Sequence, residues 1–144
     1  MRPGCRAPYL DSSALLKRII EEAESGPLRA ALRDHIEDNA VLLSSRLASI
    51  EVSRAIRVRF DLGYADAADF VDDAMSGVAE QPVGDEVVSL SQRLNPNRLR
   101  SLDAIHVAAA MLLDVDLLIT YDDRMADAGQ RNGLRCAAPG VQRG

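Results

Sequence analysis

Short apolar runs alternate with longer stretches of helical periodicity along this chain. The short runs are bounded by polar or turn-forming residues and predict β-strands at 8–10, 41–43, 78–83, 117–120 and 134–137. Between them, apolar side chains recur every three or four positions and predict helices at 13–24, 28–38, 46–60, 66–75, 85–94, 103–113 and 124–130. Because strands that alternate with helices are typical of a mostly parallel sheet covered on both faces, we expect a three-layer α/β/α sandwich.

Capping and turn residues set several of the expected boundaries. Ser12 or Ser13 is expected to cap the first helix, and Ser45 the third. Gly63 is expected to close the third helix. Pro82 cannot donate to a sheet ladder, so the third strand is expected at an edge of the sheet.

The stretch from 98 to 124 organises the rest of the chain. Its helix is apolar on nearly all sides, which is typical of a buried helix, yet it begins with Asp103. The short strand that follows runs into Asp122 and Asp123. Acidic groups therefore lie at the edges of two buried elements, which is where we expect a functional site.

Length and composition restrict the possible functions. At 144 residues, with 47% hydrophobic and 27% charged residues, the chain is expected to form one globular domain spanning 1–144. Its core is expected at about 8–139, followed by a short flexible tail after Pro139. Aromatic residues make up 3% and Trp is absent, which argues against a base-stacking platform. The net charge of −5 argues against a general polyanion binder but allows a local basic patch.

The cysteines and the hydropathy of the chain bear on where the protein is located and on whether it holds a structural zinc ion. Cys5 and Cys136 lie near opposite ends without CxxC spacing, so a structural zinc site is not supported. The first residues lack the apolar segment of a signal peptide, and no apolar run approaches ~18 residues. We therefore expect a protein of the reducing cytoplasm with no membrane span.

Two of the acids follow strands whose carboxyl ends meet at one edge of the sheet. Asp11 comes directly after the first strand, and Asp122 follows the strand at 117–120 after one residue. Ligands of such sheets bind outside the carboxyl ends of the strands. Asp103 and Glu51 lie on helices that pack on the sheet, so we expect them to lean toward the same edge.

Each acid also has a purely structural interpretation. Asp11 can accept backbone N–H bonds at the start of the next helix. Asp103 can be a first-turn acid that the helix dipole favours. Asp122 and Asp123 can be turn residues. Taken one at a time, these alternatives stay open.

Glu51 is harder to explain structurally, because it interrupts an apolar helical face. That face is expected to comprise Leu47, Ala48, Ala55 and Val58. A buried carboxylate without a partner is costly, so Glu51 needs either an arginine or a metal ion. Arg54, one turn further along, is the candidate arginine.

Taken together, the acids favour a metal site. Several carboxylates aimed at one point repel one another, and without a cation some would take up protons. Mg²⁺ or Mn²⁺ removes this repulsion and prefers oxygen ligands. Such an ion can activate water and neutralise the charge of a phosphate under attack, so the expected substrate class is a phosphodiester. The expected metal ligands and catalytic residues are Asp11, Glu51, Asp103 and Asp122.

Other polar residues carry weaker signals. Ser13 and Thr120 flank the two strand ends, where they can orient a carboxylate or act as ordinary capping and strand-end residues. Arg98 and Arg100 adjoin Asp103, which makes them the best candidates for a basic rim that contacts phosphates. His106 has no second His or Cys nearby and is interpreted as a helix histidine with satisfied hydrogen bonds.

Four short motifs, taken in order, resemble those of PIN domains. They are YLDSSALLK, LASIEVSRA, LRSLDAIHVAAA and LLITYDDRM. Within that group the chain is most similar to the VapC-type toxins of bacterial type II toxin–antitoxin pairs. The resemblance extends from Tyr9 to about Pro139. The family's acidic and polar positions fall on Asp11, Glu51, Asp103, Asp122, Ser13 and Thr120.

The resemblance implies a fold, an activity and partners. It implies an α/β/α sandwich, Mg²⁺- or Mn²⁺-dependent cleavage of an RNA substrate, a homodimer, and inhibition by a cognate VapB-type antitoxin. The family pattern of Thr, any residue, Asp favours Asp122 over the adjacent Asp123 as the fourth acid.

Three other classes of protein are alternatives to this family. A haloacid-dehalogenase-type metal-dependent phosphatase requires a second aspartate two residues after Asp11, where this chain has Ser13. A receiver domain requires a phosphoacceptor aspartate after a central strand, and the strand at 41–43 is followed by serines. A catalytically silent PIN-like binding module is left open by the sequence.

Overall fold

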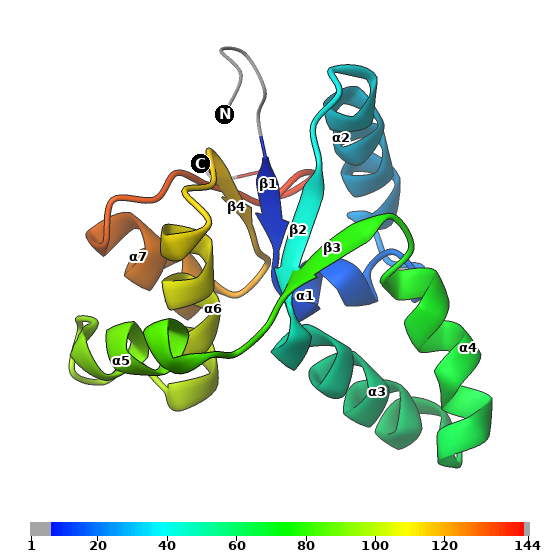
Figure 1. Cartoon of the computed structure of the whole chain (residues 1–144). Helices are drawn as coiled ribbons and strands as arrows, with labels where there is room; N and C mark the ends of the chain where they lie inside the picture. Colours follow the sequence, from blue (N-terminus) through cyan, green and yellow to red (C-terminus); the bar gives the residue numbers. More distant parts are fainter. Residues whose placement is uncertain (1–6, 143–144) are drawn as a thin grey trace.

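A parallel sheet forms the centre of the molecule (Figure 1). The computed structural model describes residues 7–142, and within this range five strands pair in the order β3-β2-β1-β4-β5, all of them parallel. The strands are β1 (Pro8–Leu10), β2 (Leu42–Ser45), β3 (Val78–Gln81), β4 (Leu117–Ile119) and β5 (Cys136–Ala137). The α/β/α class and the edge position of the third strand are confirmed, and β3 ends just before Pro82.

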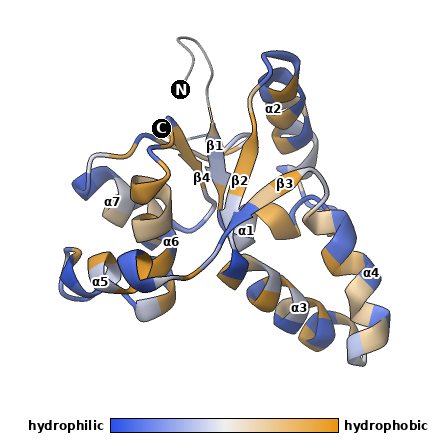
Figure 2. Cartoon of the chain, viewed as in Figure 1, coloured by the Kyte–Doolittle hydropathy of each residue, from blue (hydrophilic) through white to orange (hydrophobic). Residues whose placement is uncertain are grey.

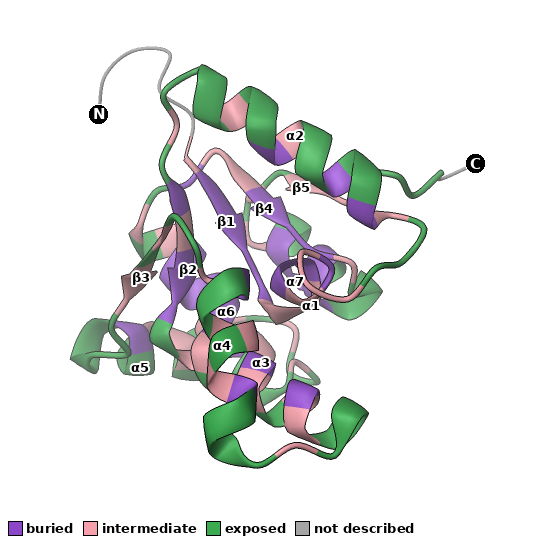
Figure 3. Ribbon diagram, turned by 90° about the vertical axis from the view of Figure 1, so that its right-hand side faces the viewer, coloured by how far each residue is buried: buried purple, intermediate pink, exposed green. Residues whose placement is uncertain are grey.

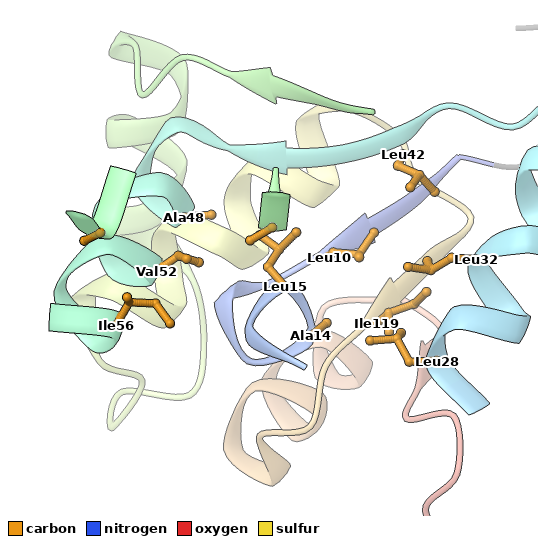
Figure 4. Packing of buried hydrophobic residues seen from close by; sticks show 12 residues of the cluster. Leu10, Ala14, Leu15, Leu28, Leu32, Leu42, Ala48, Val52, Ile56 and Ile119 are labelled. Carbon is orange, nitrogen blue, oxygen red and sulfur yellow. The ribbon is translucent and has the colours of Figure 1, made fainter. Parts of the chain in front are cut away.

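Helices cover both faces of this sheet. They are α1 (Ser12–Leu16), α2 (Ser25–Glu37), α3 (Arg46–Phe60), α4 (Tyr64–Ala74), α5 (Asp85–Arg93), α6 (Ser101–Leu112) and α7 (Asp123–Arg131). Side chains alternate in direction along each strand, so neighbouring residues reach opposite faces. Leu10 and Ile119 pack with α1, α2 and α3 in one core cluster (Figure 4). Tyr9 and Leu118 pack with α6 and α7 in the other.

The central strands are the most deeply buried part of the fold (Figure 3). All three residues of β1 are buried, and complete burial of a side chain such as Leu10 contributes about 1.5–3 kcal/mol. In the register, Leu10 pairs with Ile119 and Tyr9 pairs with Leu43. The residues that follow β1 and β4 are therefore neighbours at the same edge of the sheet.

The first helix is shorter than its apolar periodicity predicts. The pattern predicts a helix to residue 24, but α1 ends at Leu16. The next residues form turns, in which Ile20 N donates to Leu16 O (2.8 Å) and Ser25 Oγ donates to Ile20 O (3.1 Å). Lys17 also pairs with Glu22 and Glu24, which lie further along this turn segment. These contacts end the helix early, and the prediction was wrong there.

The third helix matches its predicted span but not its predicted face. Its buried residues are Ala48, Val52 and Ile56, whereas Val58 is 80% exposed. Apolar and polar residues alternate around α3 and α4 in Figure 2. The apolar pattern therefore does not mark one face of α3 clearly, and Val58 was wrongly assigned to the buried face. Ser45 caps α3 as predicted, with its Oγ accepting from Leu47 N (3.1 Å).

Two further expectations concern chain ends and turns. Gly63 does not close α3: Asp61, with φ of 51°, is its C-cap, and Gly63 is the N-cap of α4.

In the C-terminal tail, the Tyr121 hydroxyl donates to Pro139 O (2.8 Å). Residues 143–144 and Cys5 lie outside the described residues, so tail flexibility stays a prediction. No helix between residues 7 and 142 is long and apolar enough to cross a membrane.

Candidate functional site

The carboxyl ends of β1 and β4 position Asp11, which is 2% exposed. Its Oδ1 accepts hydrogen bonds from Ser13 Oγ (2.6 Å) and Ala14 N (3.1 Å), and its Oδ2 accepts one from Thr120 Oγ1 (2.6 Å). Asp11, rather than Ser12 or Ser13, is therefore the cap of α1. The same bonds hold the carboxylate at the edge of the sheet. Asp11 can therefore cap α1 and belong to the candidate site at the same time.

The two hydroxyls that hold Asp11 also hold the loop after β4. Ser13 Oγ accepts from Tyr121 N (2.9 Å), and Thr120 Oγ1 accepts from Asp122 N (3.1 Å). Each hydroxyl thus donates to Asp11 and accepts a backbone N–H, which fixes its rotation. Burial raises the pKa of Asp11, and the hydrogen bonds from Ser13 and Thr120 oppose that rise.

Asp103 occupies the first turn of α6 and is partly exposed. Partial burial raises its pKa most, the negative charges of Asp122, Asp11 and Glu51 raise it further, and only His106 acts in the opposite direction. A pocket of about 250 Å³ lies here, lined in part by Glu51, Asp103 and Asp122. The four acids that the sequence singles out therefore lie within electrostatic range of one another.

The two adjacent aspartates after β4 take different positions. Asp122 is the N-cap of α7 and accepts from Arg124 N (2.9 Å) and Met125 N (3.4 Å) through Oδ1. It also lines the pocket with Glu51. Asp123 lies in the first turn of α7 and lines the larger adjoining cavity, whose lining also includes Asp103. Of the two, Asp122 is the one that shares a pocket with Glu51 and acts on the pKa of Asp103.

Glu51 has a partner that the sequence analysis did not identify. His106 Nε2 lies within hydrogen-bond distance of Glu51 Oε1, so the protein partner of Glu51 is His106 and not the candidate arginine, Arg54. The imidazole is 1% exposed, and its Nδ1 lies 2.7 Å from the Tyr9 hydroxyl. Both ring nitrogens are hydrogen-bonded, which confirms the satisfied helix histidine. The sequence did contain one indication that His106 lies near the acids: it follows Asp103 by one turn and is on the same side of the helix.

The acidic side chains are of the type that binds a divalent cation, but they are not arranged as a finished metal site. Within residues 7–142, no group of three or more His, Cys, Asp or Glu side chains is arranged to hold a metal ion as it stands. The donor set consists of carboxylate oxygens, which suit Mg²⁺ or Mn²⁺. Burial raises the pKa of Asp103 most and repulsion from the other acids raises it further, and a cation would relieve that repulsion. Asp122 is exposed and Asp103 partly so, which leaves both side chains room to rotate inward.

Arginines border the acidic pocket on two sides. Arg98 and Arg100 are exposed in the loop between α5 and α6. Arg100 lines the acidic pocket, and Arg98 lines the larger cavity beside it. Arg124, at the start of α7, lines both. The sequence analysis missed Arg124, although it directly follows the two adjacent acids.

A family model described as PIN domain matches residues 9–130 of the chain. The chain is 42% identical over 135 residues to Ribonuclease VapC46 of Mycobacterium tuberculosis, covering 92% of this chain and 98% of that protein. It is 33% identical over 137 residues to Ribonuclease VapC47 of the same species, covering 94% and 98% of the two chains.

Two solved structures share the fold. The crystal structure of VapBC2 from Rickettsia felis, bound to a DNA fragment from its promoter, matches with a TM-score of 0.72 and 10% identity, covering 92% of this chain and 98% of that one. VapC20 of Mycobacterium tuberculosis, a Sarcin-Ricin loop cleaving toxin, matches with a TM-score of 0.68 and 15% identity, covering 85% and 95%. Together with the family match and the curated relatives, this likeness shows that the chain belongs to the PIN-domain family, as a VapC-type ribonuclease toxin of a toxin–antitoxin system.

Proposed function

We propose that this VapC-type ribonuclease cleaves RNA phosphodiesters endonucleolytically in the cytoplasm, with Mg²⁺ or Mn²⁺ held by its carboxylates. The ligands would be Asp11, Glu51, Asp103 and Asp122. The observation that supports this most is that Glu51, Asp103 and Asp122 line one pocket. Burial raises the pKa of Asp103, and the negative charges of Asp122, Asp11 and Glu51 raise it further. Ionised carboxylates within this range of one another destabilise the metal-free site, and a divalent cation removes that cost.

The chain's own groups have distinct tasks in this proposal. When bound, the cation would supply charge neutralisation at the phosphate and an activated water. Ser13 and Thr120 hold the buried Asp11 in one orientation, and His106 holds Glu51. Arg100, at the rim of the pocket, is placed to contact the phosphate of the bound strand, as a charge-assisted donor.

Metal dependence is tested directly with the purified chain. We expect it to cleave an unstructured RNA in the presence of Mn²⁺ and to lose this activity in EDTA. The matched control is Glu51→Gln, which keeps the size of the side chain and removes its charge. Cleavage that persists in EDTA contradicts the metal role. A folded chain that cleaves no RNA with either Mg²⁺ or Mn²⁺ favours the silent binding module instead.

We also propose that a VapB-type antitoxin silences this toxin. Two structural neighbours are VapBC assemblies, from Rickettsia felis and Mycobacterium tuberculosis. A cavity of about 370 Å³ lies between α3 and α4, with Ile50 (60% exposed) and Tyr64 (72% exposed) in its lining. Because α3 also carries Glu51, an antitoxin segment seated there could extend a basic side chain to the acids.

Co-expression tests this partner. The small protein encoded beside the toxin should co-purify with it, and the complex should lack nuclease activity. We expect Ile50→Asp to weaken the complex, because it places a charge in the apolar groove, and to leave the free toxin active. Recovery of active, unbound toxin from a co-expressing cell contradicts the proposal.

A further inference from the structure

The buried pair of Tyr9 and His106 holds one carboxylate oxygen of Glu51. Nε2 of His106 lies 2.5 Å from Glu51 Oε1, whereas no residue between 7 and 142 forms a hydrogen bond with Oε2. The Glu51 side chain is 21% exposed and lines the acidic pocket of about 250 Å³. Because the imidazole is only 1% exposed, Oε1 is directed toward the core, and Oε2 is the oxygen that Glu51 offers to the pocket.

His106 is itself fixed from its other side. Its Nδ1 lies 2.7 Å from the hydroxyl of Tyr9, a fully buried residue of β1, and the two rings meet edge to face with their centroids 5.7 Å apart. Val107 and Ala110 of the same helix pack in the core cluster that contains Tyr9. The imidazole therefore cannot follow Glu51 if that carboxylate turns, and Nε2 would then lose its partner inside the core, which is unfavourable.

Asp11 is oriented by the protein in a comparable way. Both of its carboxylate oxygens accept hydrogen bonds from hydroxyl groups. The pocket thus combines two carboxylates that the protein orients, Asp11 and Glu51, with two that are more exposed, Asp103 and Asp122. For the two oriented carboxylates, the direction of each oxygen is set before a cation arrives. The number of oxygens that Glu51 can offer is therefore set by His106 and not by the cation.

Divalent cations differ in how well a glutamate with a single available oxygen suits them. Mg²⁺ requires near-ideal octahedral geometry at about 2.0–2.1 Å and keeps several of its waters. Mn²⁺ also suits octahedral sites of carboxylate and water oxygens. Ca²⁺ takes about six to eight oxygens at about 2.3–2.6 Å, often including both oxygens of one carboxylate. A glutamate that is restricted to one oxygen therefore removes a ligand that Ca²⁺ commonly uses and that the smaller cations do not need.

We propose that Tyr9 and His106 make the acidic pocket selective for Mg²⁺ or Mn²⁺ over Ca²⁺, because they allow Glu51 to offer a cation only one oxygen. Both are positioning residues, since they act through Glu51 and are not part of the lining of the pocket. The inference rests on the proposed function for the place of the cation. Selectivity among cations, however, is a property of the chain without RNA and can be measured apart from cleavage.

Isothermal titration of the full chain with Mn²⁺, Mg²⁺ and Ca²⁺, without RNA, measures the selectivity as a ratio of affinities. The wild type should bind Mn²⁺ and Mg²⁺ more tightly than Ca²⁺. The double variant Tyr9→Phe/His106→Leu removes both polar groups together and frees Glu51, so the ratio of Mn²⁺ to Ca²⁺ affinity should fall by about tenfold or more. The matched control is Val107→Ala, which removes core packing from the same helix. It should lower the melting temperature and keep the wild-type ratio.

Two single variants decide the question if the double variant does not fold. His106→Gln can place an amide nitrogen near the position of Nε2, so it should keep the wild-type ratio of affinities. His106→Asn is shorter and can reach only the position of Nδ1, so it should lose the selectivity.

The outcomes separate this inference from the proposed function. A wild-type ratio in the double variant or in His106→Asn overturns the selectivity role, while Mn²⁺-dependent cleavage would still stand. A wild-type chain that binds Ca²⁺ as tightly as Mn²⁺ overturns it as well. A chain that prefers Mn²⁺ through His106 but cleaves no RNA supports the inference and contradicts the proposed catalysis. A folded wild-type chain that binds none of the three cations contradicts both.

Discussion

His106 Nε2 lies 2.5 Å from Glu51 Oε1, in a pairing that joins α6 to α3. Burial raises the pKa of Tyr9 well above its usual range, so the Tyr9 hydroxyl keeps its proton, and it lies 2.7 Å from His106 Nδ1. A chain of hydrogen bonds thus runs from the core to the pocket and holds one oxygen of Glu51.

We expect Tyr9 and His106 to contribute to stability as a unit. His106→Leu should cost about 1–3 kcal/mol of unfolding free energy, because the buried Tyr9 hydroxyl loses its partner. Tyr9→Phe alone should also destabilise the chain. The double variant should cost less than the sum of the two single changes. Urea unfolding of the four proteins measures this, and strictly additive losses contradict the coupling.

Asp103→Asn separates a helix-terminus acid from a metal ligand. The lost dipole interaction costs at most about 1 kcal/mol. If Asp103 binds the cation, removing its charge also relieves repulsion with Asp122, so the metal-free variant should be as stable as the wild type or more so. RNA cleavage should fall by orders of magnitude. Wild-type-like cleavage by this variant excludes Asp103 from the site.

Melting with and without Mn²⁺ gives a second readout for the same variant. A ligand present at 100 times its Kd stabilises a folded protein by about 2.7 kcal/mol. The wild type should therefore melt at a higher temperature with Mn²⁺, and Asp103→Asn should gain much less. Equal gains for the two proteins would place the cation elsewhere.

The stability of the metal-free chain should depend on pH through Asp11 and Asp103. Folding raises the pKa of both carboxyl groups, so the folded state holds their protons more tightly than the unfolded state. The stability they contribute is full below the ordinary carboxyl pKa and is lost as pH rises through the raised values. Urea unfolding in EDTA should show higher stability at about pH 5 than at about pH 8. Asp103→Asn should show a smaller difference, and an unchanged difference contradicts this assignment.

Thr120→Val tests how Asp11 is held. The change keeps the shape of the side chain but removes the donor to Asp11 Oδ2 and the acceptor for Asp122 N. We expect a loss of about 1–3 kcal/mol and a clear fall in cleavage rate at saturating Mn²⁺. Thr120→Ser keeps the hydroxyl and should restore most of both. A Thr120→Val protein with wild-type activity shows that this hydroxyl does not position the site.

Dimerisation is expected from the family resemblance and from apolar surface that the fold leaves uncovered. Part of this surface lies on α2, where Ile36 is 54% exposed. More apolar surface lies where α3 ends, at Val58 (80% exposed) and Phe60 (45% exposed). Light scattering at micromolar concentration should report about twice 15.6 kDa. A monomer under these conditions rejects the dimer.

Much of the fold was predictable because its periodicity is local. The runs at 8–10 and 117–120 carry apolar residues at nearly every position, and buried parallel strands require this pattern. Asp11 and Asp122 could be placed at one edge because the carboxyl ends of parallel strands meet there. The early end of α1 was not predictable, since it depends on the contact between Ser25 and Ile20 across a turn.

The partner of Glu51 was not predictable for a similar reason. His106 is 55 residues away in sequence, and the two side chains meet only because α3 and α6 pack at the same end of the sheet. A search limited to one helix finds Arg54, which is exposed. Arg124 was missed because its importance depends on a groove that forms only when α7 lies beside the loop before α6.

The bond between Asp11 and Thr120 also has a consequence for the order in which the candidate site can form during synthesis. The two residues are 109 positions apart, and β1 is the middle strand of the sheet although it is made first. Until β4 has left the ribosome, β1 lacks one neighbour and Asp11 lacks one of its three hydrogen-bond donors. A nascent chain that ends before Thr120 therefore cannot hold Asp11 as the complete fold does, so the candidate site can take its final arrangement only late in synthesis.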